Sequence, residues 1–433
     1  MTATRRDAQV GIESPPGGGQ LSQGSQKEGM KMARCAGSRL RVLQRTGAVA
    51  VVLMCLAACG SSDGSSSDGS SDGGTYVWGL DAELSGPISF YGQGLLTGVK
   101  AYVDSVNAEG GINGKKIDLK SLDDAGDSSR AAANAVQLVT ADKVNAIFGH
   151  ALSANCTAAT ATAERYKVPL GCVSVATPNS WVYNIGADDS QAPEALFEAA
   201  KSLSGKSNPR AALIYGNTLT VEQMAKDVKS GASAAGVNVV ASEELSLTAT
   251  DSSTQVAKVV AAKPDVVWVS GTPTGFASIV KGLRSAGVNV PVVQIDGTSS
   301  IAALSTSKDA NTYALSIYKQ VDPASTDSFV KGYIAAVKKA TGKTTVTFSD
   351  LNSSLVASGY MGAYAFGDAL KRCGASCSGE DLQEALNSTS VSMGGMLDSF
   401  AYGETSRYPY RNWYLYKSQG TKVELKQTIP LTD

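Results

Sequence analysis

Short runs of β-branched and aromatic residues alternate along the chain with longer segments in which apolar residues recur three and four positions apart. The first run covers residues 76–80 and is broken by Ser85-Gly86-Pro87. A helix follows to about Ala108, because its apolar residues form one stripe. The turn at Asn113-Gly114 then leads into a strand over residues 116–122. The residues of the stripe are Leu95, Val99, Tyr102, Val103 and Val106.

The same alternation continues to about residue 300. The pattern predicts helices over residues 128–141 and 153–166, and strands over the ranges 145–148, 170–175, 211–215, 237–240, 266–269 and 290–295. Strands that alternate with helices indicate parallel sheets with helices on both faces. A body of about 360 residues is long enough for two cores. The sequence therefore predicts an α/β protein with two doubly wound parallel-sheet lobes.

The amino terminus has the pattern of an export signal. A basic segment precedes the apolar residues 46–58, which are too few to span a bilayer. Leu56-Ala57-Ala58-Cys59 is similar to a bacterial lipobox, which predicts lipidation of Cys59 and cleavage before it; the alternative is an ordinary secretion signal with an incidental cysteine. We expect residues 1–58 to be a signal peptide with an upstream extension. Residues 59–74, rich in Gly, Ser and Asp, are expected to form a tether.

Charge and motifs exclude several functions. Removal of residues 1–58 takes away eight Lys or Arg and three Asp or Glu, which leaves 30 basic and 36 acidic residues and a net charge of −6. The remaining chain has no segment in which basic and aromatic residues alternate, which argues against nucleic acid as a partner. Neither a Walker loop nor a His-Glu-x-x-His motif occurs, and Gly-x-Ser-x-Gly occurs only in the tether. We therefore expect that the protein is not an enzyme and that it binds no cofactor.

Four cysteines remain after Cys59, and an even number outside the cytoplasm suggests disulfides. Three pairings are open, and proximity in sequence favours Cys156 with Cys172 and Cys373 with Cys377. A zinc site is not expected, because the chain has a single His and one Cys-x-x-x-Cys without a second half.

The segment Leu84 to Asp127, with its loop, helix, Gly-Gly stop and Asn-Gly turn in this order, resembles the branched-chain amino-acid-binding family of type I periplasmic solute receptors. The resemblance implies two lobes joined by a three-stranded hinge, with the ligand cleft between them. It places chain crossings near Asp188, Lys319 and Phe400. Lobe 1 is expected to comprise residues 75–188 plus 320–400, and lobe 2 residues 189–319 plus 401–433.

Ligands of open parallel sheets bind beyond the carboxyl ends of the strands. In the first lobe this position is held by residues 85–91, 150–153 and 176–177, and in the second by 217–220, 271–274 and 296–297. Ser153 begins a helix, so it either caps that helix or helps to bind a ligand carboxylate there. The family pattern also implies a ligand contact for Thr177. The carbonyl of Val175 would accept a hydrogen bond from an ammonium group.

Four more residues are candidates. Asp296 corresponds to an acidic position that meets the ligand's α-ammonium in the family's amino-acid receptors, although a turn residue would look the same. Asp188 matches another acidic position and fits a hinge nearly as well. Tyr91 fits the aromatic that lines the pocket, or ordinary core. His150, the single His, is a further candidate as ligand donor or pH sensor, with an incidental role as the alternative.

The resemblance implies an extracytoplasmic, lipid-anchored receptor that binds a small polar solute and delivers it to an ABC permease. The favoured ligand is an amino acid with an apolar side chain. An amide, a urea-like compound or an aromatic acid remains open as the ligand. A sensory protein on the same fold is an alternative, and an extracytoplasmic hydrolase is a less favoured one.

Overall fold

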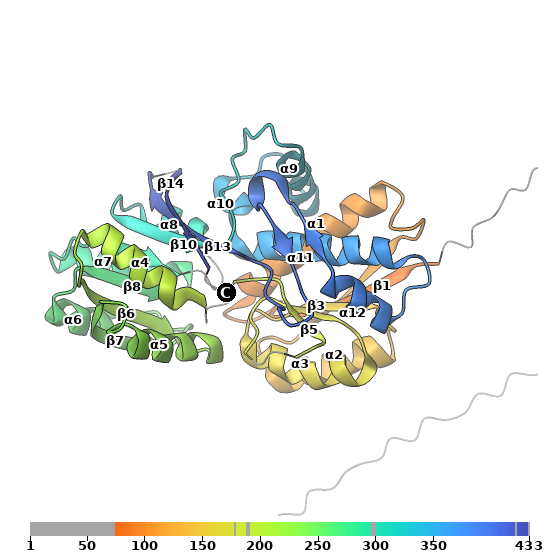
Figure 1. The fold of residues 1–433 in the computed structure, drawn as a ribbon, viewed down its shortest axis with the longest axis horizontal. Helices are drawn as coiled ribbons and strands as arrows, with labels where there is room; N and C mark the ends of the chain where they lie inside the picture. The colour runs from red at the N-terminus through yellow and green to blue at the C-terminus, as the bar shows by residue number, and fades with distance from the viewer. Residues whose placement is uncertain (1–73, 177–178, 188–190, 296–299, 421, 432–433) are drawn as a thin grey trace, which may run out of the picture. The chain divides into compact units, whose positions relative to one another are not determined.

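The computed structural model describes residues 74–176, 179–187, 191–295, 300–420 and 422–431 (Figure 1). The predicted export signal, Cys59 and nearly all of the tether lie outside these ranges, as do Thr177, Asp188 and Asp296. Two main sheets and the helices packed on them make up the described part of the chain.

The first sheet has five parallel strands in the order β2-β1-β3-β4-β5. Its strands are β1 (Tyr76–Ala82), β2 (Ile117–Asp123), β3 (Ala146–Gly149), β4 (Leu170–Cys172) and β5 (Val182–Asn184). The helices between them are α1 (Ser89–Ala108), α2 (Ser128–Thr140) and α3 (Ser153–Tyr166). In Figure 1, α2 and α3 lie on the opposite side of these strands from α1, which is the layering that right-handed crossovers produce.

The second sheet has seven strands in the order β14-β13-β10-β9-β8-β6-β7. Its parallel strands are β6 (Arg210–Gly216), β7 (Asn238–Leu245), β8 (Val266–Ser270), β9 (Val292–Gln294) and β10 (Thr312–Ser316). Its helices are α4 (Ala192–Ser204), α5 (Leu219–Gly231), α6 (Ser253–Ala262), α7 (Pro273–Ser285) and α8 (Ser300–Ser307). The edge is antiparallel, because β13 (Asn412–Ser418) pairs with β10 and with β14 (Val423–Pro430).

The segment between β10 and β13 returns to the first sheet. The 20-residue helix α11 (Ser354–Cys373) packs along α1, and α9 (Ser328–Thr341) also contacts α1. Glycines allow the close approach of α1 and α11: a Cβ on Gly98 would lie 2.2 Å from the carbonyl oxygen of Val356, and one on Gly359 would lie 2.6 Å from that of Leu95. The remaining elements are α10 (Phe348–Leu351), α12 (Gly379–Asn387), η2 (Gly394–Met396) and the small pair β11 (Ser390–Val391) and β12 (Phe400–Ala401).

Aromatic side chains dominate the core of the first sheet. Trp78 of β1 is fully buried, and its ring centroid lies 5.0 Å from that of Phe148 on β3 and 6.1 Å from that of Tyr102 on α1. Phe148 in turn lies 4.8 Å from Phe366 of α11. Large rings of this kind bury the most apolar area per residue, so they hold the strands of this sheet to α1 and α11 and fix where the strand ends lie.

Candidate functional site

A pocket lies where the carboxyl ends of strands from both sheets meet. The first sheet contributes Tyr91 of α1, the loop after β3 and a residue that follows β4; the second contributes the loops after β6 and β8. Open α/β sheets bind ligands at this position, and the predicted rims meet here. The free volume of the pocket is about 30 Å³, which has room for a water molecule but not for an amino acid, so the pocket must widen for such a ligand to bind. The lining residues are Tyr91, Ala151, Leu152, Ser174, Gly216, Thr218, Thr220, Val221, Leu247, Ser270 and Gly271.

One hydrogen bond crosses the pocket. The hydroxyl oxygens of Ser174 and Thr220 are 3.0 Å apart. Ser174 follows β4 of the first sheet, whereas Thr220 lies in the first turn of α5 on the second sheet and is 8% exposed. This pair therefore forms only when the two rims are together, and any change that separates the rims breaks it.

Tyr91 lies in the first turn of α1 with 2% of its surface exposed, and it lines the pocket. Its ring centroid is 4.1 Å from that of Phe90, which is 41% exposed. The structure thus places Tyr91 where the sequence predicts a pocket-lining aromatic. A direct contact between Tyr91 and a ligand stays a prediction.

Ser153 is the first residue of α3, as the sequence predicts, but Leu152 holds the N-cap position. Leu152 has no side chain that can cap, and no other side chain caps this helix in the described part of the protein. Of the two roles that the sequence leaves open for Ser153, capping of α3 is therefore not the one that the structure shows. Its hydroxyl is fully buried and has no hydrogen-bond partner among the described residues. A buried hydroxyl without a partner is costly, and the uncapped helix start leaves N–H groups that favour an anion.

Val175 is half-buried and packs against the apolar cluster that contains Cys156 and Cys172. The pocket is lined by its neighbour Ser174 and not by Val175 itself. The role of the Val175 carbonyl stays a prediction. Thr177, Asp188 and Asp296 lie outside the described residues. Their ligand contacts therefore stay predictions.

Two disulfides join the cysteine pairs that are close in sequence. Cys156 of α3 is bonded to Cys172 at the end of β4, with their Cα atoms 6.1 Å apart. This bridge fixes the first turn of α3 against the strand that leads to Ser174. It thereby links two segments next to the pocket.

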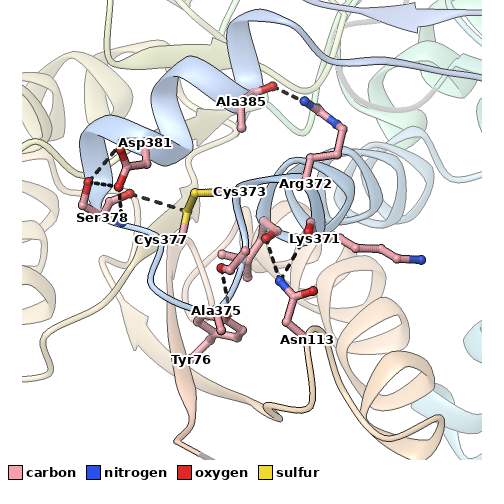
Figure 2. Close-up of a disulfide and its surroundings, with 12 residues drawn as sticks. Tyr76, Asn113, Lys371, Arg372, Cys373, Ala375, Cys377, Ser378, Asp381 and Ala385 are labelled. Carbon is pink, nitrogen blue, oxygen red and sulfur yellow. Dashed lines mark hydrogen bonds between the residues drawn. A yellow bond between two sulfur atoms is a disulfide. The ribbon is translucent and has the colours of Figure 1, made fainter.

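The second disulfide joins Cys373 at the end of α11 to Cys377 (Figure 2). The turn that it closes lies beside the start of β1, since the Tyr76 hydroxyl donates to the Gly374 carbonyl at 3.2 Å. Ser378 then caps α12 together with Asp381. This bridge contributes no residue to the pocket lining.

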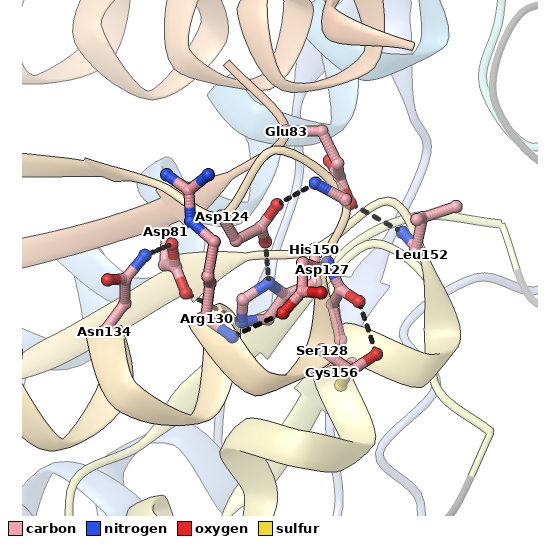
Figure 3. Close-up of polar contacts among 12 residues, drawn as sticks. Asp81, Glu83, Asp124, Asp127, Ser128, Arg130, Asn134, His150, Leu152 and Cys156 are labelled. Atoms are coloured by element: carbon pink, nitrogen blue, oxygen red, sulfur yellow. Dashed lines mark hydrogen bonds and ion pairs between the residues drawn. The ribbon is translucent and has the colours of Figure 1, made fainter. Parts of the chain in front are cut away.

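His150 belongs to a buried polar cluster beneath the rim (Figure 3). It is fully buried, and its Nδ1 lies 3.1 Å from Oδ2 of Asp124 while its Nε2 lies 3.8 Å from Oδ2 of Asp81. It adopts a left-handed backbone conformation (φ 43°), which is uncommon for a residue other than glycine. His150 does not line the pocket, so a direct contact with a ligand there has no support from its position.

Asp81, Glu83 and Asp124 are also fully buried in this cluster, which the hydrophobic pattern of the sequence did not predict. The predicted strand over residues 76–80 extends to Ala82, which carries Asp81 into the interior. The signal was present in the sequence: Asp81, Asp124 and His150 lie at the ends of three successive strands, and these strands are neighbours in the order β2-β1-β3. The ladder pairs Asp81 with Gly149 and Ala82 with Asp123, so the three side chains are nearly level.

Burial changes the acidity of the cluster. It raises the pKa of Asp81 to about 7, and it raises the pKa of Glu83, with a further contribution from the charge of Asp124. Burial alone would lower the pKa of His150, but the hydrogen bond to Asp124 and the charges of Asp81 and Glu83 outweigh it and leave that pKa raised. Ionised carboxylates are therefore disfavoured here unless a positive charge accompanies them.

The fold is that of a two-lobed α/β protein with a pocket at the strand ends of both sheets. The profile of the periplasmic binding protein family matches residues 79–422. The chain belongs to this family, which confirms the resemblance and the fold class. None of the helices in the described residues is long and apolar enough to cross a membrane.

Curated relatives include the Leu/Ile/Val/Thr-binding protein of Salmonella typhimurium and the Leu/Ile/Val-binding protein of Escherichia coli. They are 28% and 27% identical over 227 residues, which is 51% of this chain and 61% and 60% of those proteins. The matched region thus spans about three fifths of the length of these relatives.

Similar solved structures include the substrate-binding protein LivJ of Streptococcus pneumoniae in complex with isoleucine, with a TM-score of 0.68 and 22% identity. A solute-binding protein from Rhodopseudomonas palustris in complex with 4-hydroxybenzoate has a TM-score of 0.70 and 17% identity. The similarity covers 82% and 83% of this chain and 99% and 98% of those chains. At these identities it shows the fold.

Proposed function

We propose that this protein captures a small carboxylate-bearing solute, an α-amino acid with an apolar side chain, and delivers it to an ABC importer while its acylated Cys59 holds it at the outer face of the cell membrane. The observation that carries the proposal is the pocket, which is lined by strand-end loops of both sheets. A ligand bound there contacts both rims at once. Part of the free energy of ligand binding therefore goes into bringing the rims together.

The carboxylate is assigned to the start of α3. This helix has no side-chain cap, and the buried hydroxyl of Ser153 lacks a partner in the described part of the protein. An anion at this point would accept hydrogen bonds from free N–H groups and from the hydroxyl, and the helix dipole favours it. Thr177 adds a second hydroxyl in this proposal.

The ammonium group is assigned to Asp296, with the carbonyl of Val175 and the carboxylate of Asp188 as further acceptors. This assignment rests on the resemblance of these positions to the family pattern. Leu/Ile/Val-binding proteins among the curated relatives support an apolar amino acid. The lining residues Gly216, Leu247 and Gly271 are small or apolar, which suits such a side chain once the pocket has widened.

An aromatic carboxylate is the second candidate ligand. Two proteins of the same fold carry 4-hydroxybenzoate and benzoate, at TM-scores of 0.70 and 0.68. These acids share the carboxylate with an amino acid but lack the ammonium, so they would use the start of α3 without Asp296. A sensory role would use the same pocket with a receptor in place of a permease.

Hydrolysis has less support. The Nδ1 of His150 faces Asp124, and its Nε2 has no hydrogen-bond partner in the described ranges. A serine nucleophile needs a histidine within hydrogen-bond reach. The buried His150 does not supply that arrangement.

A thermal-shift panel on the full-chain protein tests the ligand class. It compares L-leucine with 4-methylpentanoate, which lacks the ammonium, with isopentylamine, which lacks the carboxylate, and with 4-hydroxybenzoate. We expect L-leucine to stabilise the protein, and a ligand at 100 times its Kd adds about 2.7 kcal/mol. Stabilisation by 4-hydroxybenzoate and 4-methylpentanoate alone would favour the aromatic or simple carboxylate. No response to any of them would reject an amino-acid receptor.

Asp296→Asn tests the ammonium contact. It keeps the shape of the side chain and removes the charge, and breaking a desolvated charge pair costs about 2–5 kcal/mol. The affinity for L-leucine should fall between ~30-fold and several thousand-fold, while the melting temperature of the empty protein changes little. Asp322→Asn, at an exposed aspartate, is the matched control. Equal affinities of the two variants would make Asp296 a turn residue.

A further inference from the structure

The buried cluster beneath the rim (Figure 3) contains two polar atoms that make no hydrogen bond within the described part of the chain and are joined only as a long ion pair. Oδ2 of Asp81 and Nε2 of His150 have no hydrogen-bond partner, although both side chains are fully buried. Leaving such atoms unpaired in the interior costs far more than a hydrogen bond gains. A bound species between them would remove that cost.

These two atoms are 3.8 Å apart, which is too long for a hydrogen bond between them. Two ligand atoms at about 2.1 Å from one metal ion can be at most ~4.2 Å apart, so one ion fits between them with a bent geometry. A carboxylate oxygen of Asp81, one of Asp124 and a ring nitrogen of His150 all lie within 4.8 Å of one another. The spacing is that of a ligand group.

Most other atoms of the cluster already have partners, although Oε2 of Glu83 has none among the described residues. Oδ1 of Asp81 accepts from the Asn134 amide at 2.8 Å, and Oδ1 of Asp124 accepts from the backbone N–H of Gly126 at 2.7 Å. With the ring proton on Nδ1, His150 donates to Oδ2 of Asp124 at 3.1 Å, and Nε2 carries a free lone pair. A carboxylate on the far ring nitrogen is the usual partner of a metal-binding histidine.

We propose that Asp81, Asp124 and His150 form a site for one divalent transition-metal ion of the Zn²⁺ class. His150 binds through Nε2 and Asp81 through Oδ2, while Asp124 orients the imidazole. An imidazole with carboxylates suits Zn²⁺ and its neighbours better than Ca²⁺ or Mg²⁺, which prefer oxygen ligands alone. This site replaces the expectation, drawn from cysteine spacing and the single His, that the protein has no metal ligands.

Charge balance supports the same assignment. The cluster holds three carboxylates, those of Asp81, Glu83 and Asp124, against one imidazole, and all four side chains are fully buried. A divalent ion compensates two negative charges without protonating any ligand. The competing way to balance the charge is uptake of protons, which the experiment below distinguishes.

The ion would stabilise the rim of the pocket. It joins the ends of β1 and β3 directly, and Glu83 of the same strand end accepts from the backbone N–H of Leu152 at 3.1 Å. Leu152 lines the pocket and precedes α3. The site itself does not depend on the identity of the ligand that the pocket binds.

The test uses the full-chain protein after chelator treatment, titrated with ZnCl₂ and, in parallel, with CaCl₂ and MgCl₂. We expect one Zn²⁺ per chain by elemental analysis, a rise of the melting temperature with Zn²⁺, and no rise with Ca²⁺ or Mg²⁺. Co²⁺ should give the visible absorption of a site with nitrogen and oxygen ligands. Absence of stoichiometric Zn²⁺, or a melting temperature that responds to pH but not to metal, would overturn the proposal in favour of protons.

Asp81→Asn identifies the ligand. It keeps the acceptor for Asn134, removes one metal ligand, and should weaken Zn²⁺ binding at least 10-fold. Because an amide needs no counter-charge, the metal-free variant should melt no lower than the metal-free wild type. Asp127→Asn is the matched control: Asp127 is exposed and caps α2, and asparagine caps equally well, so its Zn²⁺ affinity should equal that of the wild type. Wild-type affinity in Asp81→Asn, or loss of folding without metal, would contradict the assignment.

Discussion

The hydrogen bond between Ser174 and Thr220 gives the sharpest prediction for the pocket. Its two hydroxyl oxygens are 3.0 Å apart and belong to opposite rims. A ligand that needs both rims binds with an apparent affinity proportional to the fraction of molecules in which the rims are together. Weakening this contact should therefore weaken ligand binding. Because both residues also line the pocket, the coupling energy between them, and not the loss in either single variant, measures the contact.

The magnitude follows from the chemistry of the pair. A neutral hydrogen bond contributes about 0.5–1.5 kcal/mol net, which corresponds to an affinity loss of roughly 2- to 12-fold. Ser174→Ala and Thr220→Val each remove one hydroxyl at nearly constant volume. The double variant should lose little more ligand affinity than either single variant, because each single change already breaks the bond. The coupling energy between the two changes should equal the free-energy contribution of the hydrogen bond.

This coupling is measured by calorimetric titration of the wild type, the two single variants and the double variant with the best ligand of the thermal-shift panel. Thr160→Val is the control, since the Thr160 hydroxyl bonds to the Cys156 carbonyl within α3 and spans no rim. A coupling energy near zero, or equal losses in the control, would refute the account of rim closure.

Three further predictions concern the anchor, a disulfide and an ion pair. Cys59→Ala should move the protein from the membrane to the soluble fraction, whereas equal partitioning of variant and wild type would reject the lipid anchor. Peptide mapping of the unreduced protein should recover Cys156 linked to Cys172, and opening this loop of 16 residues should cost about 3 kcal/mol; cross-paired peptides would contradict the structure. The hydrogen bonds from Arg284 hold the pKa of Asp309 below its usual value, so their stabilisation is present above about pH 4 and is lost as the pH falls further. Asp309→Asn should therefore cost about 1–2 kcal/mol at pH 7 and progressively less as the pH falls below about 4, as chemical denaturation across this pH range would show.

Much of the fold was accessible from the sequence because hydrophobic periodicity is a local property. The helix predicted over residues 153–166 coincides with α3, and the strand predicted over residues 266–269 lies within β8 (Val266–Ser270). The antiparallel edge formed by β13 and β14 was missed, since the pattern of parallel units does not reveal a reversal of the chain at its carboxyl end.

The rims of the pocket were predictable for a different reason: the ends of parallel strands meet at one edge. The N-cap of α3 was not, because Leu152 occupies a position that usually holds a capping side chain. The buried cluster was missed because Asp81, Asp124 and His150 are far apart in sequence and become neighbours only through the strand order. A charged residue near the end of an apolar strand gives no local sign of its partners.

Hydrogen exchange of the full-chain protein, with and without a saturating amount of the ligand identified by the panel, tests the central claim most directly. If one solute binds between the rims, amides in residues 150–154 and in residues 216–221 should both become protected. A separate groove, lined among others by Tyr102 of α1 and Tyr364 of α11, serves as the control, and the protection of its amides should not change. Protection of only one rim, or of the groove in place of the rims, would contradict the account.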